Sequence, residues 1–467
     1  MKREKSKEKS TFLLSFSLFS FNFLLLFGAA LRLLALPLPG THDIAVWKIW
    51  SYGAATEGVA HVYGVGGTPP ERKELSLHGA TSTVDYPPLA MYELAAIGHV
   101  YRWLNGGAYP DDVRLIVAVK VLPVVADAGI LAVLCLLVKS RWAALVYWLN
   151  PAVLLDAAML GYLDTLFVLP ALGGLAAAAV EAPIWAGALA AAAVLTKPQA
   201  VVVVPAIAVA VVCVGHPAAR LGRALRAAAA AAAVSLVVLL PIVRAGALPN
   251  LVNALSRLGH HDMLSGNASN VWWIVGWALR AYYSAHDMGT WAAWTAPARI
   301  LAITRVVELG YPNPRTIGLA LTASAAVWAI WKARAARDLW IAAALAAFLV
   351  HAFATLSAQV HENHLFAAVP LLAVAAAGRR AFTPVFIAVS AILAVNLNLF
   401  YGVSEDIGYA LPRALAPIDL SVLLASINCG ALIWHARVFR RECSTAAASR
   451  PAPGLASIPA LEARTRW

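Results

Sequence analysis

Long apolar runs, which recur from Thr11 to Leu432, constrain this chain more than any other feature. Many of them approach the roughly 20 residues that a helix needs to cross a bilayer. Only 13% of the 467 residues are charged, whereas about a quarter are charged in an average soluble protein. The sequence therefore predicts an all-α polytopic membrane protein that lies in a lipid bilayer and carries no soluble domain.

We expect about 12 or 13 membrane-spanning helices from these runs. The first, Thr11–Leu36, is too long for a signal-peptide core and lacks a small-residue cleavage site, which favours a retained anchor. Lys197-Pro198 separates two short runs, and proline forbids an unbroken helix there. These two runs could be two thin spans, a re-entrant pair or one kinked helix. The remaining spans are expected at 87–104, 114–138, 142–158, 163–180, 183–196, 198–214, 224–243, 315–331, 338–357, 364–378, 382–400 and 417–435.

The net charge of +12 reflects basic residues in the termini and in short connections. Basic short loops mark the cytoplasmic side of a membrane protein, so this charge does not require a nucleic-acid partner. Both termini are basic, which requires an even number of crossings, and the parity stays open in the region 104–200. From Arg220 onward the loops alternate, which places 245–313 and 359–364 outside and Arg379-Arg380 inside.

Residues 1–437 are expected to form one membrane domain with two large outer segments, 40–86 and 245–313. Residues 438–467 are expected to form a disordered cytoplasmic tail. Within the second outer segment, Asn270–Tyr283 is short and aromatic, which indicates an interfacial or re-entrant helix. The four cysteines form neither a disulfide pattern nor a zinc pattern.

Two acidic residues, Asp43 and Asp85, frame the first outer segment. Each lies at the edge of an apolar run, where an ionised carboxylate is costly unless it faces water, a partner or a substrate. Asp43 could act as a general base on an acceptor hydroxyl, or it could cap a helix over Ile44–Gly53. Asp85 could instead cap a helix that begins at Pro87-Pro88. Aromatic side chains that favour the membrane surface lie between or beside the two acids: Trp47, Trp50, Tyr52, Tyr63 and Tyr86.

The sequence His361-Glu362-Asn363-His364 joins two apolar runs on the expected outer face. Imidazoles three residues apart can share one face of a helix. His361 and His364 could bind a phosphate, donate a proton or bind a metal, and zinc would need at least one further ligand. An ordinary interfacial loop is the alternative.

Polar residues also interrupt the apolar runs. A lysine as deep as Lys197, followed by Gln199, is a functional candidate, although its side chain could snorkel to the membrane surface. Asp127 and Asp164 are similar cases, and each could be a buried hydrogen-bonding partner rather than a participant in chemistry.

Taken in order, these motifs resemble those of the GT-C superfamily of integral-membrane glycosyltransferases. The chain is most similar to the branch of the dolichyl-phosphate-glucose-dependent glucosyltransferases and the related prokaryotic polyprenyl-phosphate mannosyltransferases. The resemblance covers about residues 40–400. It rests on Asp43, Asp85-Tyr86-Pro87-Pro88-Leu89 with Tyr92, Asn150-Pro151, Gly161-Tyr162-Leu163-Asp164, Lys197-Pro198-Gln199, Asn267-Ala268-Ser269-Asn270-Val271-Trp272-Trp273 and Val360-His361-Glu362.

The resemblance implies a GT-C-type helical bundle with interfacial helices in its outer loops. It implies inverting transfer of a hexose, glucose or mannose, from a polyprenyl-phosphate-linked donor. The acceptor would be a lipid-linked oligosaccharide or another glycan or lipid on the outer or lumenal face. Asp43 would be the general base, and Lys197, His361 and Arg379 are candidates to stabilise the leaving phosphate. Substrate-binding residues would include His42, Asp85, Tyr86, Gln199, Glu362 and His364.

Two departures from the family pattern bear on these expectations. The metal-using oligosaccharyltransferases of the superfamily carry paired acids in the first loop, whereas this chain has His42-Asp43. We therefore expect no metal and no other cofactor. Asn363 stands where the eukaryotic glucosyltransferases have lysine, so the sugar cannot be transferred by analogy.

The location expected is a prokaryotic plasma membrane, or the endoplasmic reticulum of a eukaryote, with the active site on the non-cytoplasmic face. A flippase or transporter of lipid-linked sugars is the main alternative function, although the sequence shows no internal repeat of the transporter kind. A non-catalytic homologue is the other alternative.

Overall fold

The computed structural model describes residues 20–65, 73–138, 141–258, 263–285, 313–334, 338–404, 414–415 and 418–448. Within these ranges helices dominate, and each of the three sheets has two short strands. Two are antiparallel, β1 (Leu75–Leu77) with β2 (Ala80–Ser82) and β5 (Ala414–Leu415) with β6 (Ile418–Asp419). The third is parallel and joins β3 (Ser265–Gly266) to β4 (Val360–His361).

Six described helices are long and apolar enough to cross a membrane, and six shorter apolar helices accompany them. The protein is therefore an all-α polytopic membrane protein. The long helices are α4 (Val113–Leu137), α10 (Arg220–Arg244), α13 (Pro314–Ala333), α14 (Leu339–Leu356), α16 (Thr383–Tyr401) and α17 (Leu420–Ala448). The shorter segments are Ser20–Ala35, α6 with the π-helical turn η3 (Pro151–Leu160), α7 (Asp164–Ala179), α8 (Pro183–Thr196), η4 with α9 (Pro198–Cys213) and η8 with α15 (Glu362–Gly378).

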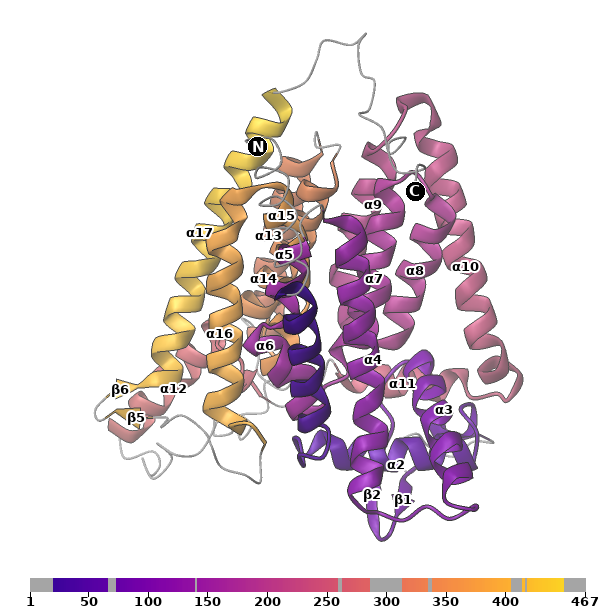
Figure 1. Ribbon diagram of the computed structural model, residues 1–467. Coiled ribbons are helices and arrows are strands. Elements are labelled where there is room, and N and C mark those ends of the chain that lie inside the picture. Colours follow the sequence, from indigo (N-terminus) through magenta and orange to yellow (C-terminus); the bar gives the residue numbers. More distant parts are fainter. Residues whose placement is uncertain are drawn as a thin grey trace, which may run out of the picture.

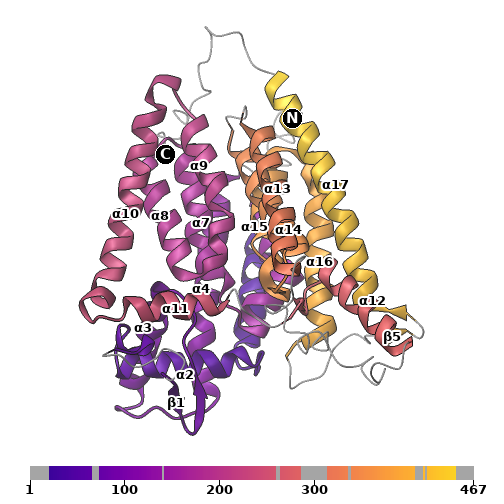
Figure 2. The same ribbon diagram turned by 180° about the vertical axis from the view of Figure 1, so that it is seen from behind.

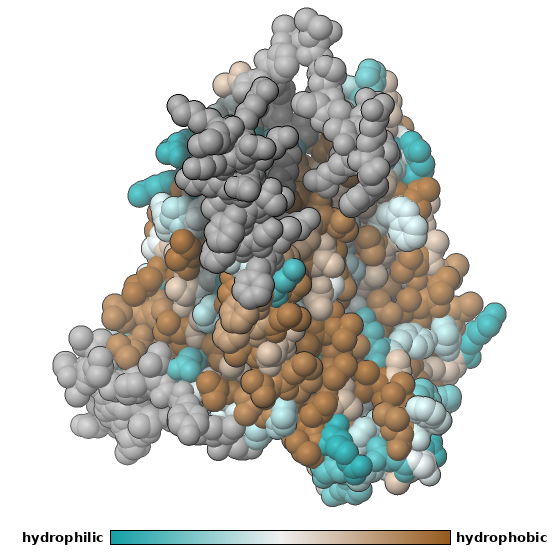
Figure 3. All heavy atoms as spheres, in the orientation of Figure 1, coloured by the Kyte–Doolittle hydropathy of each residue, from teal (hydrophilic) through white to brown (hydrophobic). Residues whose placement is uncertain are grey.

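The long axes of most helices run in one direction, in two groups (Figure 1). One group contains α4, α7, α8, α9 and α10, and the other contains α13 to α17, as the view from behind also shows (Figure 2). Apolar side chains cover much of the visible surface between two more polar ends (Figure 3). On α10, Leu221, Leu225, Leu236 and Val237 are exposed, as expected for side chains that face lipid tails rather than water.

A layer of shorter elements closes one end of the bundle (Figures 1 and 2). It contains α2 (Asp43–Thr56), β1, β2, α3 (Pro88–Leu104) and α11 (Leu248–Leu258). Leu251 and Ala254 of α11 are buried against this layer. Both predicted outer segments therefore meet on the same end of the molecule.

The expected span at 87–104 is wrong, because α3 lies in this layer. The segments on both sides of α3 contact α2: the Tyr86 ring packs against Trp50 with centroids 5.3 Å apart, and the Tyr109 hydroxyl lies 2.7 Å from the Ser51 hydroxyl. Midway along α3, a Cβ at Gly98 would lie 2.4 Å from the Ser51 carbonyl oxygen. The amphipathic character of α3 explains the error, since its apolar face packs on α2 and not on lipid. Among the described residues, the six long and six shorter apolar helices do not include α3 and make an even number, as two basic termini on one side require.

The Lys197-Pro198 interruption is a reversal between two separate passes. Lys197 is extended between α8 and η4. Arg223, at the start of α10, reaches both Glu181, just before α8, and the Val211 carbonyl near the end of α9. The start of α8 and the end of α9 therefore share one end of the bundle, and Lys197 lies at the other.

The expected span 142–158 is a broken helix. It is divided into α5 (Arg141–Trp148), α6 (Pro151–Val153) and η3 (Leu154–Leu160), and Asn150 caps the Ala152 N–H. Asp127 of α4 is a buried structural partner here, because it accepts hydrogen bonds from Arg32 at 2.6 Å and from Tyr147 at 2.7 Å.

Helix α17 continues to Ala448, so residues 438–448 are ordered and not part of a disordered tail. Phe439 and Cys443 are buried, and Arg379 lies 3.6 Å from Glu442. These contacts fix the end of α17 to neighbouring helices. Residues 449–467 lie outside the described part of the chain.

The aromatic segment of the second outer segment forms a helix, α12 (Val271–Ala285). Trp272 donates to the Leu356 carbonyl and Trp273 to the Ser421 hydroxyl, so both indoles attach α12 to the bundle. Much of the rest of the predicted outer segment, 286–312, lies outside the described residues.

Candidate functional site

A cavity of about 780 Å³ lies between the closing layer and the ends of the bundle helices. Its size is within the range usual for small-molecule sites. It takes its lining from both outer segments, from the α8–η4 reversal and from the β4–η8 connection. Of the predicted site residues, all but Arg379 line it: His42, Asp43, Asp85, Tyr86, Lys197, Gln199, His361, Glu362 and His364.

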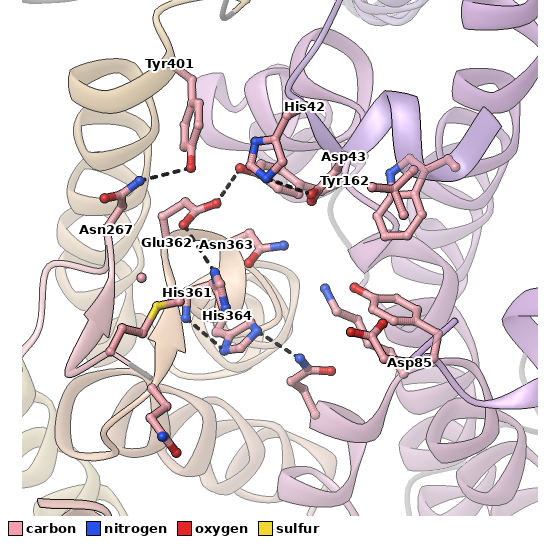
Figure 4. Close-up of a pocket in the computed structure, with 18 of the residues that line it drawn as sticks. His42, Asp43, Asp85, Tyr162, Asn267, His361, Glu362, Asn363, His364 and Tyr401 are labelled. Carbon is pink, nitrogen blue, oxygen red and sulfur yellow. Dashed lines mark hydrogen bonds and ion pairs between the residues drawn. The ribbon is translucent and has the colours of Figure 1, made fainter. Parts of the chain in front are cut away.

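Asp43 lies beside the cavity between Glu362 on one side and Asp85 on the other (Figure 4). It is the first residue of α2, whose N-cap is His42, so the predicted capping role for Asp43 is wrong. Its side chain is 28% exposed and lies 3.3 Å from His42 Nε2. Burial raises the pKa of Asp43, His42 acts against that shift, and Glu362 adds to it. A carboxylate with such a pKa, partly open to a cavity, can accept a proton.

Asp85 does not cap α3 either, because the N-cap of α3 is Pro87 and no side chain caps it. Burial raises the pKa of Asp85 to about 6, Arg257 opposes this shift, and Asp43 adds to it. Tyr86, next along the chain, forms an aromatic cluster with Trp47 and Trp50, in which the ring centroids are 5.0 to 5.3 Å apart.

Glu362 occupies the opposite side of the cavity from Asp85 (Figure 4). The Tyr162 hydroxyl donates a hydrogen bond of 2.5 Å to Glu362 Oε1. Tyr162 follows Gly161, which has a left-handed backbone with φ +79° and would bring a Cβ to 2.5 Å from Ile44. Glycine at this turn therefore lets the chain carrying Tyr162 approach α2.

The two predicted histidines are held in different ways. The His361 backbone N–H donates to His364 Nδ1 at 3.3 Å. Nε2 of His364 lies 2.8 Å from Nε2 of the Gln199 side-chain amide. The side-chain oxygen of Gln199 is buried and has no hydrogen-bond partner among the described residues.

The imidazole of His361 lies against Gly266 of β3, where a Cβ would come within 2.6 Å of His361 Nδ1. Glycine in this strand leaves room for the ring. Burial lowers the pKa of His361, and Asp43 opposes that shift. His361 is therefore mainly neutral near pH 7 and able to donate one hydrogen bond from its ring.

Lys197 forms a buried ion pair at the cavity floor. Its ammonium lies 2.8 Å from Asp164 Oδ1, and the two side chains are only 2% and 1% exposed. Asn363 donates to the other oxygen of Asp164 at 2.7 Å. Asp164 is thus a hydrogen-bonding partner, and Lys197 does not snorkel. Asn363 is a structural residue in this chain because it completes the set of partners around Asp164.

Arg379 does not belong to the site. It lies at the end of α15 and pairs with Asp338 at 2.8 Å. The expectation that Arg379 could stabilise a leaving phosphate is therefore wrong, since the pair lies at the other end of the bundle from the cavity (Figure 1).

Sequence reasoning missed several residues of the cavity wall. Asn267, named above only as the start of a motif in the resemblance, lines the cavity and donates its amide N–H to the Tyr401 hydroxyl at 3.1 Å. Asn396 donates to the Asn267 carbonyl at 3.0 Å, and Asn428 donates to the Ser269 carbonyl at 2.7 Å. Buried amides on α16 and α17 thus hold this wall. No local sequence signal identifies such long-range partners.

Lys120 of α4 was also missed, and it positions the turn that carries Asp43. Its ammonium is fully buried and donates to the carbonyls of Ala35, Leu38 and Met159 at 3.1, 2.9 and 2.8 Å. Helix ends leave such carbonyls without partners, and a cation there is stabilising. The signal was present, because Lys120 interrupts an apolar run just as Lys197 does.

No protein-family model and no curated protein matches this sequence. The functional argument therefore rests on the cavity and its side chains.

Proposed function

We propose that this protein is a membrane-bound hexosyltransferase that uses a polyprenyl-phosphate-linked sugar. The position of Asp43 carries this proposal. A partly exposed carboxylate that caps no helix projects beside a cavity at the edge of the membrane. The base and the substrate-binding residues implied by the GT-C resemblance, far apart in sequence, line this same cavity, and Arg379 does not.

In the proposed reaction, Asp43 takes the proton from an acceptor hydroxyl as that oxygen attacks the anomeric carbon of the donor sugar. A bond forms between this oxygen and the anomeric carbon. The bond from that carbon to the phosphate oxygen breaks, and polyprenyl phosphate leaves with the electron pair. Attack from the face opposite the leaving group inverts the anomeric centre.

The leaving phosphate needs hydrogen-bond donors or positive charge. His361 and His364 lie across the cavity from Asp85 (Figure 4), Gln199 lies beside His364, and we infer that N–H groups of these side chains serve as donors. Lys197 adds charge from the floor, although Asp164 neutralises it. We place the donor phosphate on this side.

The transfer reaction is tested directly by reconstituting the purified protein in lipid nanodiscs with polyprenyl-phosphate mannose or glucose. Release of polyprenyl phosphate that depends on an added acceptor, followed by mass spectrometry of the product, would support the proposal. In the native organism, deletion of the gene should leave lipid-linked or other saccharides that are one hexose shorter. A deletion strain with unchanged saccharides and no transfer in nanodiscs would contradict the proposal.

We further propose that the cavity faces the non-cytoplasmic side. The end of the bundle away from the cavity carries the basic clusters, such as Lys332 with Arg334 and Arg440 with Arg441, and basic loops remain in the cytoplasm.

Cysteine labelling checks this orientation. In a variant without the four native cysteines, Ala80→Cys should react with an impermeant thiol reagent added to intact cells. Ala80 is exposed on β2, in the layer beside the cavity. Ala377→Cys is the matched control, since Ala377 is exposed near the end of α15, at the other end of the bundle. It should react only after permeabilisation, and the reverse pattern would invert the proposed topology.

Transfer is also expected to survive chelation of divalent metals. At the start of the first outer segment a single acid, Asp43, follows His42, where the metal-using members of the superfamily carry a pair of acids. Activity in excess EDTA should match the untreated protein within experimental error. If EDTA abolished transfer and Mn²⁺ or Mg²⁺ restored it, the site would recruit a metal, and His42 with the 361–364 histidines would be the first ligands to test.

A further inference from the structure

A pair of buried imidazoles joins α14 to α17 inside the bundle. Nδ1 of His351 lies 3.2 Å from Nδ1 of His435, and both side chains are fully buried. The rings of Phe348 and Phe382 meet the His435 ring edge to face. A charged imidazole is costly in such surroundings, so we take both rings as neutral, and one of them must donate its proton to the other.

Asn428 of α17 decides which of the two rings is the donor. Its Nδ2 donates to the Ser269 carbonyl at 2.7 Å and to Thr355 Oγ1 at 3.2 Å, and a carbonyl can only accept. Oδ1 of Asn428 therefore faces His351 Nε2, 3.0 Å away, and accepts a hydrogen bond from it. A neutral His351 with its proton on Nε2 accepts at Nδ1, so His435 carries its proton on Nδ1 and is the donor.

His435 holds His351 in this tautomer. In the other neutral tautomer, His351 would turn an unprotonated Nε2 toward Asn428 Oδ1, and two acceptors would face each other. The Asn428 side chain would then have to turn, and the Ser269 carbonyl would lose its donor. Within the described part of the chain, Nε2 of His435 has no hydrogen-bond partner. An unpaired nitrogen costs free energy relative to an apolar side chain, which indicates that the donor at Nδ1 has a use.

The Ser269 carbonyl belongs to the segment that supports His361. Gly266 pairs with His361 in the parallel sheet, and Asn267 forms a further backbone bridge to it. The ring of His361 also lies against Gly266, as described above. A shift of the Ser269 carbonyl would therefore move the backbone on which His361 packs.

We propose that His351 and His435 are positioning residues for the cavity. Through Asn428, this histidine pair holds the segment 264–269 and thereby places the ring of His361. Neither His351 nor His435 lines the cavity. The expected effect on transfer rests on the proposed function, because that function places the donor phosphate near His361, whereas the proton arrangement and the position of His361 are independent of it.

The proton arrangement is tested by solid-state NMR on the full-length protein in nanodiscs, labelled with ring-¹⁵N histidine. A correlation is expected between two ring nitrogens, of which the protonated one is His435 Nδ1 and the unprotonated one is His351 Nδ1. It should be absent from His435→Asn, which assigns it. A wild-type protein without this correlation, or with the proton on His351 Nδ1, would overturn the proposal.

The position of His361 is tested with a matched pair of variants. His435→Leu removes the donor, whereas His435→Asn keeps a donor near the position of Nδ1. The ring resonances of His361, assigned through His361→Gln, should shift in His435→Leu and in Asn428→Leu and stay close to wild type in His435→Asn. Where His435→Leu does not fold, His435→Gln takes its place, because it moves the donor to the position of Nε2.

Phe439→Leu is the control for lost packing. Phe439 is buried one turn beyond His435 on α17 and stacks on Phe348, so its replacement removes apolar contact and no hydrogen bond. The His361 resonances should not shift in Phe439→Leu. An equal shift in Phe439→Leu, or no shift in His435→Leu, would contradict the positioning role.

Turnover should follow the position of His361. His435→Leu is expected to lower kcat by about 3- to 10-fold and to leave the acceptor KM unchanged, and His435→Asn should restore kcat. The loss is modest because Asn396 also holds the segment, through the Asn267 carbonyl at 3.0 Å. Combining His435→Leu with Asn428→Leu should lose no more than the larger single loss, since both act through one chain of hydrogen bonds. Losses that multiply would show separate effects and contradict the proposal.

The two proposals fail in distinguishable ways. A His361 position that depends on His435, with no transfer from any polyprenyl-phosphate sugar, would retain the positioning pair and contradict the proposed function. Transfer that His435→Leu leaves unchanged, with unshifted His361 resonances, would retain the function and contradict the positioning pair.

Discussion

Asp43→Asn should lower the turnover number of hexosyl transfer by about 10²- to 10⁴-fold, the usual effect of removing a general base. The amide has nearly the same shape as the carboxylate but cannot accept the acceptor proton. Folding should be little affected, because Asp43 caps no helix and its one ion pair within the described part of the chain is with His42, at 3.3 Å. Turnover with a purified donor and acceptor is the measurement, and unchanged turnover would contradict the assignment of Asp43.

Asp111→Asn provides the matched control. Asp111 lies in the same layer, pairs with Lys48 at 2.6 Å and does not line the cavity, so activity should be retained.

The pH profile of the transfer reaction provides a second check on Asp43. A general base must be ionised, and burial raises the pKa of Asp43, so activity should fall as pH decreases through a value above that of an ordinary aspartate. The residual activity of Asp43→Asn should lack this acid limb.

Lys197→Met should destabilise the protein by about 3–5 kcal/mol, the usual result of removing one partner of a buried ion pair. The substitution leaves Asp164 buried with only Asn363 as its neutral partner. A lower unfolding temperature and less folded protein after purification are the expected results. Lys48→Met is the control, because its partner Asp111 is 40% exposed, and such pairs contribute about 0–1 kcal/mol.

The double variant Lys197→Met with Asp164→Asn separates stability from function. It removes both charges, so most of the lost stability should return. Transfer should remain low if the Lys197 charge assists the leaving phosphate, and the loss should be larger for kcat than for acceptor KM. Full activity in a stable double variant would show that Lys197 is structural and that His361, His364 and Gln199 act on the phosphate without it.

The lengths and polarity of the apolar runs were sufficient to predict most of the helices. α4, α7, α10, α13, α14 and α16 begin and end within a few residues of the expected spans. The sequence could not show that α3 lies on α2 outside the bundle, because an amphipathic helix that buries one face against another helix resembles a thin span in composition. Nor could it choose among the three arrangements around Lys197-Pro198, which contacts between α8, α9 and α10 decide.

The site residues were predicted from their chemistry. Charged side chains and imidazoles at the edges of apolar runs cost free energy unless they face water, a partner or a substrate. The same logic applies to Lys120, whose three carbonyl partners were not visible in the sequence. Capping roles for Asp43 and Asp85 were plausible from the sequence, and backbone geometry at His42 and Pro87 excluded them.

The sequence by itself determined that this chain lies in a membrane, which segments are apolar, and which polar residues have no place in lipid. Those properties depend on the free energy of transferring each side chain from water to lipid. That free energy is set by the side chain itself and not by residues far away in the sequence. Only the tertiary structure decided that Asp43, Lys197 and His361 line one cavity and that Lys197 pairs with Asp164. It likewise decided that Arg379 lies at the opposite end of the bundle. These facts depend on which distant helices pack together, and the hydrophobic effect that drives packing is non-directional, so periodicity alone cannot specify the partners.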